Sequence, residues 1–119
     1  MTTALPQIRP NQLAHWRDAL HADRPDAACV LLDVREPWEV QTASVHADGF
    51  QTVAIPMGEL PNRLGELDPS QPVACLCHHG ARSQRVALFL QHSGFADVAN
   101  IAGGIDAWSR ERDAAVPLY

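Results

Sequence analysis

The sequence contains no lysine, and its 9 basic residues are arginines that form no cluster. The 14 acidic residues outnumber them, which gives a formal net charge of −5. Proteins that bind nucleic acid or an anionic membrane mainly through charge present a dense basic patch. The charge pattern therefore argues against nucleic acid and membranes as the main partner.

Long apolar runs are also absent, and none approaches the ~20 residues needed to span a bilayer. The N-terminal residues MTTALPQIRPNQ lack the basic segment and the apolar stretch of a signal peptide. Cysteine is scarce, and the odd total of 3 fits a reducing compartment better than a disulfide framework. These absences predict a cytoplasmic protein.

The chain has 119 residues, of which 46% are hydrophobic and 19% are charged. This length fits one domain, and such a domain buries enough surface to hold a core without disulfides. The sequence contains no internal repeat, low-complexity tract or linker. We therefore expect residues 1–119 to form a single domain.

Four short apolar runs alternate with segments of helical spacing. The runs cover residues 29–34, 52–56, 72–77 and 97–103. The segments of helical spacing cover residues 11–20, 58–68, 83–93 and 103–112. Apolar runs that alternate with helices are typical of parallel strands covered on both faces. The sequence therefore predicts an α/β fold with a mostly parallel central sheet between helices.

Three less ordinary segments directly follow predicted strands. They are residues 33–36, 77–83 and 103–104. In open parallel sheets, ligands bind beyond the carboxyl ends of the strands. The alternation of strands and helices alone therefore predicts that these three segments meet at one edge of the sheet.

The segment CHHGARS runs from Cys77 to Ser83, in the turn between a predicted strand and a predicted helix. Gly80 suits a positive φ, and a tight loop of this kind turns successive backbone N–H groups inward. The helix N-terminus adds unpaired N–H groups, and Ser83 is a suitable helix cap. Arg82 adds a full charge with donors suited to an oxyanion. Such surroundings favour the thiolate of Cys77, which is the nucleophilic form.

The three segments together resemble those of the single-domain rhodaneses, the thiosulfate sulfurtransferases. CHHGARS is similar to the active-site loop of that family, and LLDVREPWE is similar to its segment after an early strand. NIAGGIDAW is similar to its Gly-Gly-aromatic segment near the C-terminus. The resemblance covers about residues 8–112. It implies the three-layer rhodanese-like fold, whose central sheet has about five short strands.

By this resemblance, the catalytic residue is Cys77, which attacks the outer sulfur of thiosulfate, releases sulfite and becomes a persulfide. Arg82 is implied to bind the sulfonate group of the donor. Asp33 and Arg35 are expected in supporting roles, through hydrogen bonds to the backbone and an ion pair. The expected anion cradle comprises His78, His79, Gly80, Ala81, Arg82 and Ser83.

The implied partners are a small-molecule sulfur donor and an acceptor, which is cyanide or a thiol, or else a sulfur-relay protein. No organic cofactor is implied. Cys75, Cys77, His78 and His79 suggest zinc, but adjacent residues on a strand and a tight turn do not converge as four ligands. We therefore predict no metal, and we interpret Cys75 and Cys29 as core residues.

Two other functions remain open on the sequence. The first is a binding or sulfur-relay module of the same fold that performs no catalysis. The second is a phosphatase or arsenate reductase, whose related loops have five residues between cysteine and arginine. Here four residues separate Cys77 from Arg82, which favours sulfur over a larger tetrahedral anion.

One segment departs from the family pattern. The family usually carries Gly-His-Ile before Gly-Ala-x-Asn-Ile-Pro, whereas residues 44–53 read SVHADGFQTV and only Ile55-Pro56 is kept. The departure concerns the local conformation and leaves the catalytic loop intact. The sequence assigns no role to this segment or to the tail AAVPLY, residues 114–119.

Overall fold

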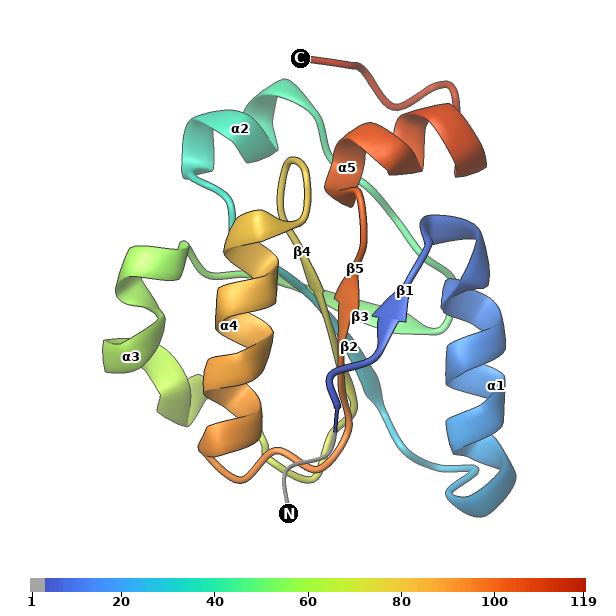
Figure 1. Cartoon of the computed structure of the whole chain (residues 1–119), viewed down its shortest axis with the longest axis vertical. Helices are drawn as coiled ribbons and strands as arrows, with labels where there is room; N and C mark the ends of the chain where they lie inside the picture. The colour runs from blue at the N-terminus through green and yellow to red at the C-terminus, as the bar shows by residue number, and fades with distance from the viewer. Residues whose placement is uncertain (1–3) are drawn as a thin grey trace.

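The protein is built around one parallel sheet of five strands (Figure 1). The structure, a computed structural model, describes residues 4–119. The strands are β1 (Gln7–Ile8), β2 (Cys29–Asp33), β3 (Phe50–Ala54), β4 (Val73–Leu76) and β5 (Val98–Ile101). The α-helices are α1 (Leu13–Asp23), α2 (Pro37–Thr42), α3 (Leu60–Arg63), α4 (Ala81–His92) and α5 (Gly104–Ala107). The predicted α/β fold with a parallel sheet is confirmed.

The strand order is β1-β5-β4-β2-β3, so β4 lies in the middle of the sheet. Every residue of β2, β4 and β5 is buried, as expected for strands covered on both faces. The edge strand β1 is missing from the sequence prediction, because two residues are too short to show periodicity. It pairs with β5, where Gln7 lies opposite Asn100.

Helices cover both faces of the sheet (Figure 1). Side chains of successive strand residues point to opposite faces. Val30 and Leu32 of β2 therefore pack in one core cluster with α3 and α4, which contribute Leu60 and Leu90. Leu31 packs in the second cluster, with residues of α1, α5 and the C-terminal segment.

The helix α2 was not predicted, and its start explains how it forms. Glu36 and Glu39 make a reciprocal capping box, and Pro37 occupies the first turn, where its missing N–H costs nothing. Six residues are too few for a clear helical period. This omission matters for function, because α2 lies at the carboxyl edge of the sheet and carries Glu39 into the site.

Other helices differ from prediction in detail. The segment 58–68 is divided into α3 and two flanking 3₁₀ turns, and its proline, Pro61, lies in the first turn of α3, where a proline is tolerated. The helix α4 begins at Ala81, two residues before the predicted start. The predicted helix 103–112 is α5 followed by a π-helical turn at Trp108–Arg112. None of the described helices is both long and apolar enough to cross a membrane.

The unusual segment before β3 is held locally. Ala47 is buried, and Arg17 of α1 donates a hydrogen bond to the carbonyl of Asp48 at 3.0 Å. The next residue, Gly49, has a φ of +81°, and a Cβ there would overlap the Arg17 side chain. The departure from the family pattern thus corresponds to a loop fixed on α1.

The three segments that follow predicted strands lie at one end of the sheet, as expected. Backbone N–H groups of α5, which follows β5, donate to the carbonyl groups of Cys77 and His78 after β4. The helices α2 and α5 lie at the same end, and the chain terminates beside them (Figure 1). The C-terminal segment is anchored by Val116, which is buried and whose carbonyl accepts a hydrogen bond from Ser109 at 2.6 Å.

Candidate active site

Cys77 directly follows β4 and begins the loop that leads into α4. The residue is buried, with 1% of its surface exposed. Its Sγ accepts a hydrogen bond from the backbone N–H of Gly80 at 3.0 Å. Gly80 has a φ of +106°, as the sequence predicts, and residues with a side chain rarely adopt this conformation. The loop therefore curls around the sulfur and turns an N–H donor toward it.

The helix α5 holds this loop in shape through hydrogen bonds to two of its backbone carbonyl groups. The N–H of Ile105 donates to the Cys77 carbonyl at 2.8 Å, and the N–H of Asp106 donates to the His78 carbonyl at 3.1 Å. A Cβ at Gly104 would overlap both of these carbonyl oxygens. Because α5 binds the carbonyl groups, the loop can turn N–H groups toward the sulfur.

Ser83 lies fully buried in the first turn of α4, between Cys77 and Asn100. Its Oγ lies 3.2 Å from Cys77 Sγ and 2.6 Å from Asn100 Oδ1. The hydroxyl has one proton, and an amide oxygen can only accept. The Ser83 hydroxyl can therefore donate its hydrogen bond to Asn100 or to a Cys77 thiolate, but not to both at once. The Asn100 amide is oriented by its own donation to Gln7 at 2.8 Å.

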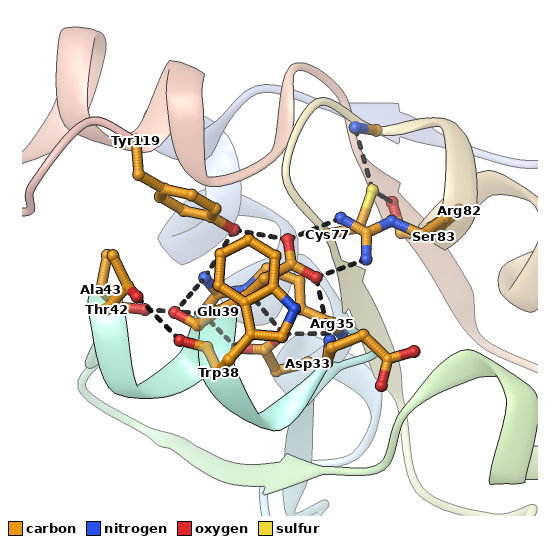
Figure 2. Close-up of polar contacts among 12 residues, drawn as sticks. Asp33, Arg35, Trp38, Glu39, Thr42, Ala43, Cys77, Arg82, Ser83 and Tyr119 are labelled. Atoms are coloured by element: carbon orange, nitrogen blue, oxygen red, sulfur yellow. Dashed lines mark hydrogen bonds and ion pairs between the residues drawn. The ribbon is translucent and has the colours of Figure 1, made fainter.

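Arg82 is held in a two-pronged ion pair with Glu39 of α2 (Figure 2). The two guanidinium nitrogens lie 2.6 and 2.8 Å from the two carboxylate oxygens. The Arg82 hydrogen bond is the main cause that lowers the pKa of Glu39 to about 2. The same contact raises the pKa of Arg82. The pair uses two of the five guanidinium N–H donors, and 32% of the Arg82 side chain remains exposed.

Tyr119 brings the C-terminal segment into this network (Figure 2). Its hydroxyl donates to Glu39 at 2.8 Å and accepts from Arg35 at 2.9 Å. Arg35 is 1% exposed, and it donates to Asp33 through two nitrogens, at 2.9 and 2.7 Å. Asp33 and Arg35 thus form the ion pair expected from the sequence, and they support Tyr119 and α2.

Aromatic rings stack beside the loop. The ring of His78 lies between those of His79 and Tyr119, with centroids 4.0 Å away on each side. Burial is the main cause that lowers the pKa of His78, followed by the nearby His79, which favours the neutral imidazole. The tail residue Tyr119 therefore contacts the Cys77 loop through its ring, while its hydroxyl contacts Glu39 and Arg35.

One group of residues in the described part of the chain has the composition of a metal site. His78, His79 and Asp106 each offer one ligand atom, and these atoms lie within 4.8 Å of one another. The two imidazole planes are stacked with only 27° between them. Ring lone pairs lie in the ring plane, so nearly parallel stacked rings do not point at one ion. Neither Cys75 nor Cys77 is in this group.

The other two thiols lie in the core. Burial raises the pKa of Cys75, which lies two residues before Cys77 in the interior of β4. Burial also raises the pKa of Cys29. All three cysteines are free thiols. Cys29 Sγ lies 3.9 Å from His21 Nε2, a longer contact than the two that Cys77 Sγ makes.

The fold and this loop define a class of protein: an α/β protein with a cysteine in a tight turn between the central strand and a helix. The family model for the rhodanese-like domain matches residues 15–111. The chain belongs to the rhodanese-like family.

Relatives in this family include proteins named for sulfur transfer. The putative sulfurtransferase YtwF of Bacillus subtilis is 36% identical over 105 residues, which cover 88% of this chain and 94% of that protein. The chloroplastic rhodanese-like/PpiC domain-containing protein 12 of Arabidopsis thaliana is 40% identical over 93 residues, 75% of this chain. The matched region is only 30% of that longer plant protein.

Solved structures agree on the fold. The crystal structure of a rhodanese-related protein from Thermoplasma volcanium superposes with a TM-score of 0.72 and 28% sequence identity. The match covers 96% of this chain and 99% of that one. The sequence therefore identified the family and the fold correctly.

The first prediction concerns the contact between α5 and the loop. Gly104→Ala should destabilise the protein by about 3 kcal/mol or more, because it adds overlap with the two carbonyl groups to the strain of a positive φ. Gly94→Ala is the matched control. Gly94 also has a positive φ, but open space surrounds it, so its cost should stay near 1 kcal/mol. Urea unfolding measures both, and equal costs would contradict the proposed contact.

The second prediction concerns acid stability. The pKa of Glu39 is about 2 in the folded protein and 4.5 without partners. A lowered carboxyl pKa stabilises the fold above pH 4.5, and this stability is lost as pH falls toward 2. The loss should be about 3 kcal/mol. Unfolding of the native protein and of Glu39→Gln between pH 2 and pH 7 tests this, because the variant should lack this part of the pH dependence. Parallel pH profiles would refute the assignment.

Proposed function

We propose that the protein transfers a sulfane sulfur, from thiosulfate or another persulfide donor, to a thiophilic acceptor through a persulfide on Cys77. The observation that carries this proposal is the surroundings of Cys77 Sγ, which has the Gly80 N–H at 3.0 Å and the Ser83 hydroxyl at 3.2 Å. Relatives named sulfurtransferase support the type of reaction.

In the first step, the Cys77 thiolate attacks the outer sulfur of the donor. The new bond joins Cys77 Sγ to that sulfur, and the donor's own S–S bond breaks. With thiosulfate, sulfite leaves with the bonding electron pair. The negative charge left on the terminal sulfur then lies in the loop. Backbone N–H groups such as that of Gly80, together with the N-terminus of the twelve-residue helix α4, favour an anion there.

In the second step, the acceptor attacks the terminal sulfur and the Cys77 thiolate leaves. Cyanide yields thiocyanate, and a thiol yields a new persulfide, so Cys77 is regenerated in either case. The acceptor in the cell is a small thiol or a sulfur-relay protein. We place the reaction in the cytoplasm, where free thiols such as the three described here persist.

Ser83 has a direct part in this cycle. When Cys77 is ionised, the Ser83 hydroxyl can turn from Asn100 to the sulfur and add a charge-assisted hydrogen bond. His78 and His79 border the loop, with His79 exposed and His78 half-buried. Gly80 contributes its backbone N–H to the sulfur, and Ala81 begins the helix α4. Arg82 joins the loop to α2 through Glu39.

The third prediction tests the persulfide itself. After treatment with thiosulfate or cysteine persulfide, the native protein should gain one sulfur, ~32 Da, and a Cys77→Ser variant should gain none. Intact mass measures this gain directly. The same gain in both proteins would place the reactive thiol at Cys29 or Cys75. No gain with either donor would favour a binding module of this fold.

A further inference from the structure

Asn100 is a polar side chain inside an otherwise apolar buried strand. It belongs to β5, and 3% of its surface is exposed. A buried amide that lacks hydrogen-bond partners destabilises the fold, so such a residue needs both a donor and an acceptor nearby. The sulfur transfer proposed above uses Cys77 and Ser83 and gives Asn100 no part of its own.

The contacts of Asn100 determine which way its amide points. Its Nδ2 donates to the backbone carbonyl of Gly80 at 3.3 Å and to Oε1 of Gln7 at 2.8 Å. A backbone carbonyl can only accept, so the amide nitrogen must be the atom that faces Gly80. The amide oxygen is therefore turned toward Ser83, whose Oγ lies 2.6 Å away.

The hydroxyl of Ser83 thus lies between two acceptors, Asn100 Oδ1 and Cys77 Sγ (Figure 2 shows the contact with the sulfur). When Cys77 is a thiol, its S–H can donate to Ser83 Oγ while Ser83 donates to Asn100, so every group has a partner. When Cys77 is a thiolate, the sulfur can only accept, and the hydroxyl donates to it because a charged acceptor forms the stronger bond. The direction of the Ser83 hydroxyl therefore follows the charge on Sγ.

Sulfur transfer removes that charge from Sγ. With thiosulfate, an electron pair of Cys77 Sγ forms the new S–S bond, and sulfite leaves with the pair of the broken S–S bond. The negative charge of the persulfide then lies on the outer sulfur, and Sγ becomes the neutral inner sulfur. A neutral sulfur is a weak acceptor. Ser83 is fully buried, so in the persulfide its hydroxyl needs another acceptor.

We propose that Asn100 is a positioning residue of the sulfur transfer, whose amide oxygen accepts the Ser83 hydrogen bond whenever Cys77 Sγ carries no charge. This inference rests on the proposed transfer through a Cys77 persulfide. Asn100 stabilises the two states in which Sγ is neutral, the thiol and the persulfide, relative to the free thiolate. It therefore favours the loading of sulfur onto Cys77.

The substitution Asn100→Leu removes the acceptor and keeps the branched shape of the side chain. The Gly80 carbonyl retains a partner, since it also accepts from the backbone N–H of Gln84 at 3.2 Å. The side chains of Gln7 and Gln84 already bond to each other and keep that contact. Ser83 is therefore the buried group whose hydrogen bonding the substitution changes most.

The fourth prediction is that Asn100→Leu favours the thiolate over both neutral states. The rate of alkylation of Cys77 by iodoacetamide, followed by peptide mass, gives the pH at which half of the thiol is ionised. This midpoint should fall by about 0.5 pH unit or more, because Cys77 Sγ is the acceptor left to Ser83. Damage to the loop would instead raise the midpoint, since the thiolate would lose N–H donors. A raised or unchanged midpoint would overturn the inference.

The loading equilibrium should change by the same free energy. Protein is mixed with thiosulfate and sulfite at fixed ratios, above the midpoint of either protein, and the persulfide fraction is measured by intact mass. The equilibrium constant for loading should fall about threefold or more in Asn100→Leu, which corresponds to a midpoint change of about 0.5. An equal or larger constant in the variant would contradict the role of Asn100.

Two controls separate this role from a general effect on the loop. Ser83→Ala removes the hydroxyl, so adding Asn100→Leu to it should leave the midpoint within about 0.2 pH unit of Ser83→Ala alone. Gln7→Leu removes a partner of the amide nitrogen but leaves Oδ1 facing Ser83, and its midpoint should match that of the native protein. An equal fall in the Ser83→Ala background, or in Gln7→Leu, would show that Asn100 does not act through Ser83.

The ionisable groups around Cys77 are the same in all these proteins, so their effects cancel in the comparison. Arg82 of α4 and Cys75 of β4 lie close enough for their charges to interact with that of Cys77. The strand β2 ends in the ion pair of Asp33 and Arg35. The groups contributed by the loop, α5, α2 and the C-terminal segment are His78, His79, Asp106, Glu39 and Tyr119.

The native protein supplies a test that needs no folded Asn100→Leu. The ¹³Cγ chemical shift of the Asn100 amide should move as Cys77 ionises and should return to the thiol value when Cys77 is loaded with sulfur. The step with pH should be absent in Cys77→Ser. A shift that does not respond to the ionisation of Cys77 would refute the inference. If neither thiosulfate nor cysteine persulfide loads native Cys77, the proposed function fails. If the native protein loads and Asn100→Leu behaves like it, only the role of Asn100 fails.

Discussion

The candidate site depends first on the contact between α5 and the loop that begins at Cys77. The carbonyl groups of Cys77 and His78 accept hydrogen bonds from the backbone N–H groups of Ile105 and Asp106. This contact needs a glycine at position 104, because any Cβ there would overlap the two carbonyl oxygens. Because α5 binds these carbonyl groups, the N–H groups of the loop can point toward the sulfur. Inward-pointing N–H groups are what a sulfur anion would need.

A second constraint is the carboxylate of Glu39, which joins parts of the chain that are distant in sequence. It binds Arg82, 43 residues away, and Tyr119, 80 residues away. Through Tyr119 it is also connected to Arg35 and so to the end of β2. The start of α4, the helix α2 and the C-terminal segment are therefore fixed relative to one another by one buried charge.

The sequence was sufficient for those parts of the site that local patterns encode. The strand that ends before Cys77, the glycine with positive φ and the Gly-Gly turn all leave signals within a few residues. Glu39, Asn100 and Tyr119 leave weaker signals, because their roles depend on contacts made only after folding. A capping box at Glu36 and a polar residue inside the buried strand β5 were the available clues. Neither clue names a partner, so the pairing of Arg82 could not be derived.

That pairing orients Arg82 at the start of α4. A loop that combines backbone donors, a helix N-terminus and a free arginine attracts oxyanions in general, since each part favours negative charge. Arg82 uses two of its five N–H donors on Glu39, and the other three remain beside the backbone donors of the loop. Those donors are fixed and short-ranged, and the Gly80 N–H is directed at the Cys77 sulfur.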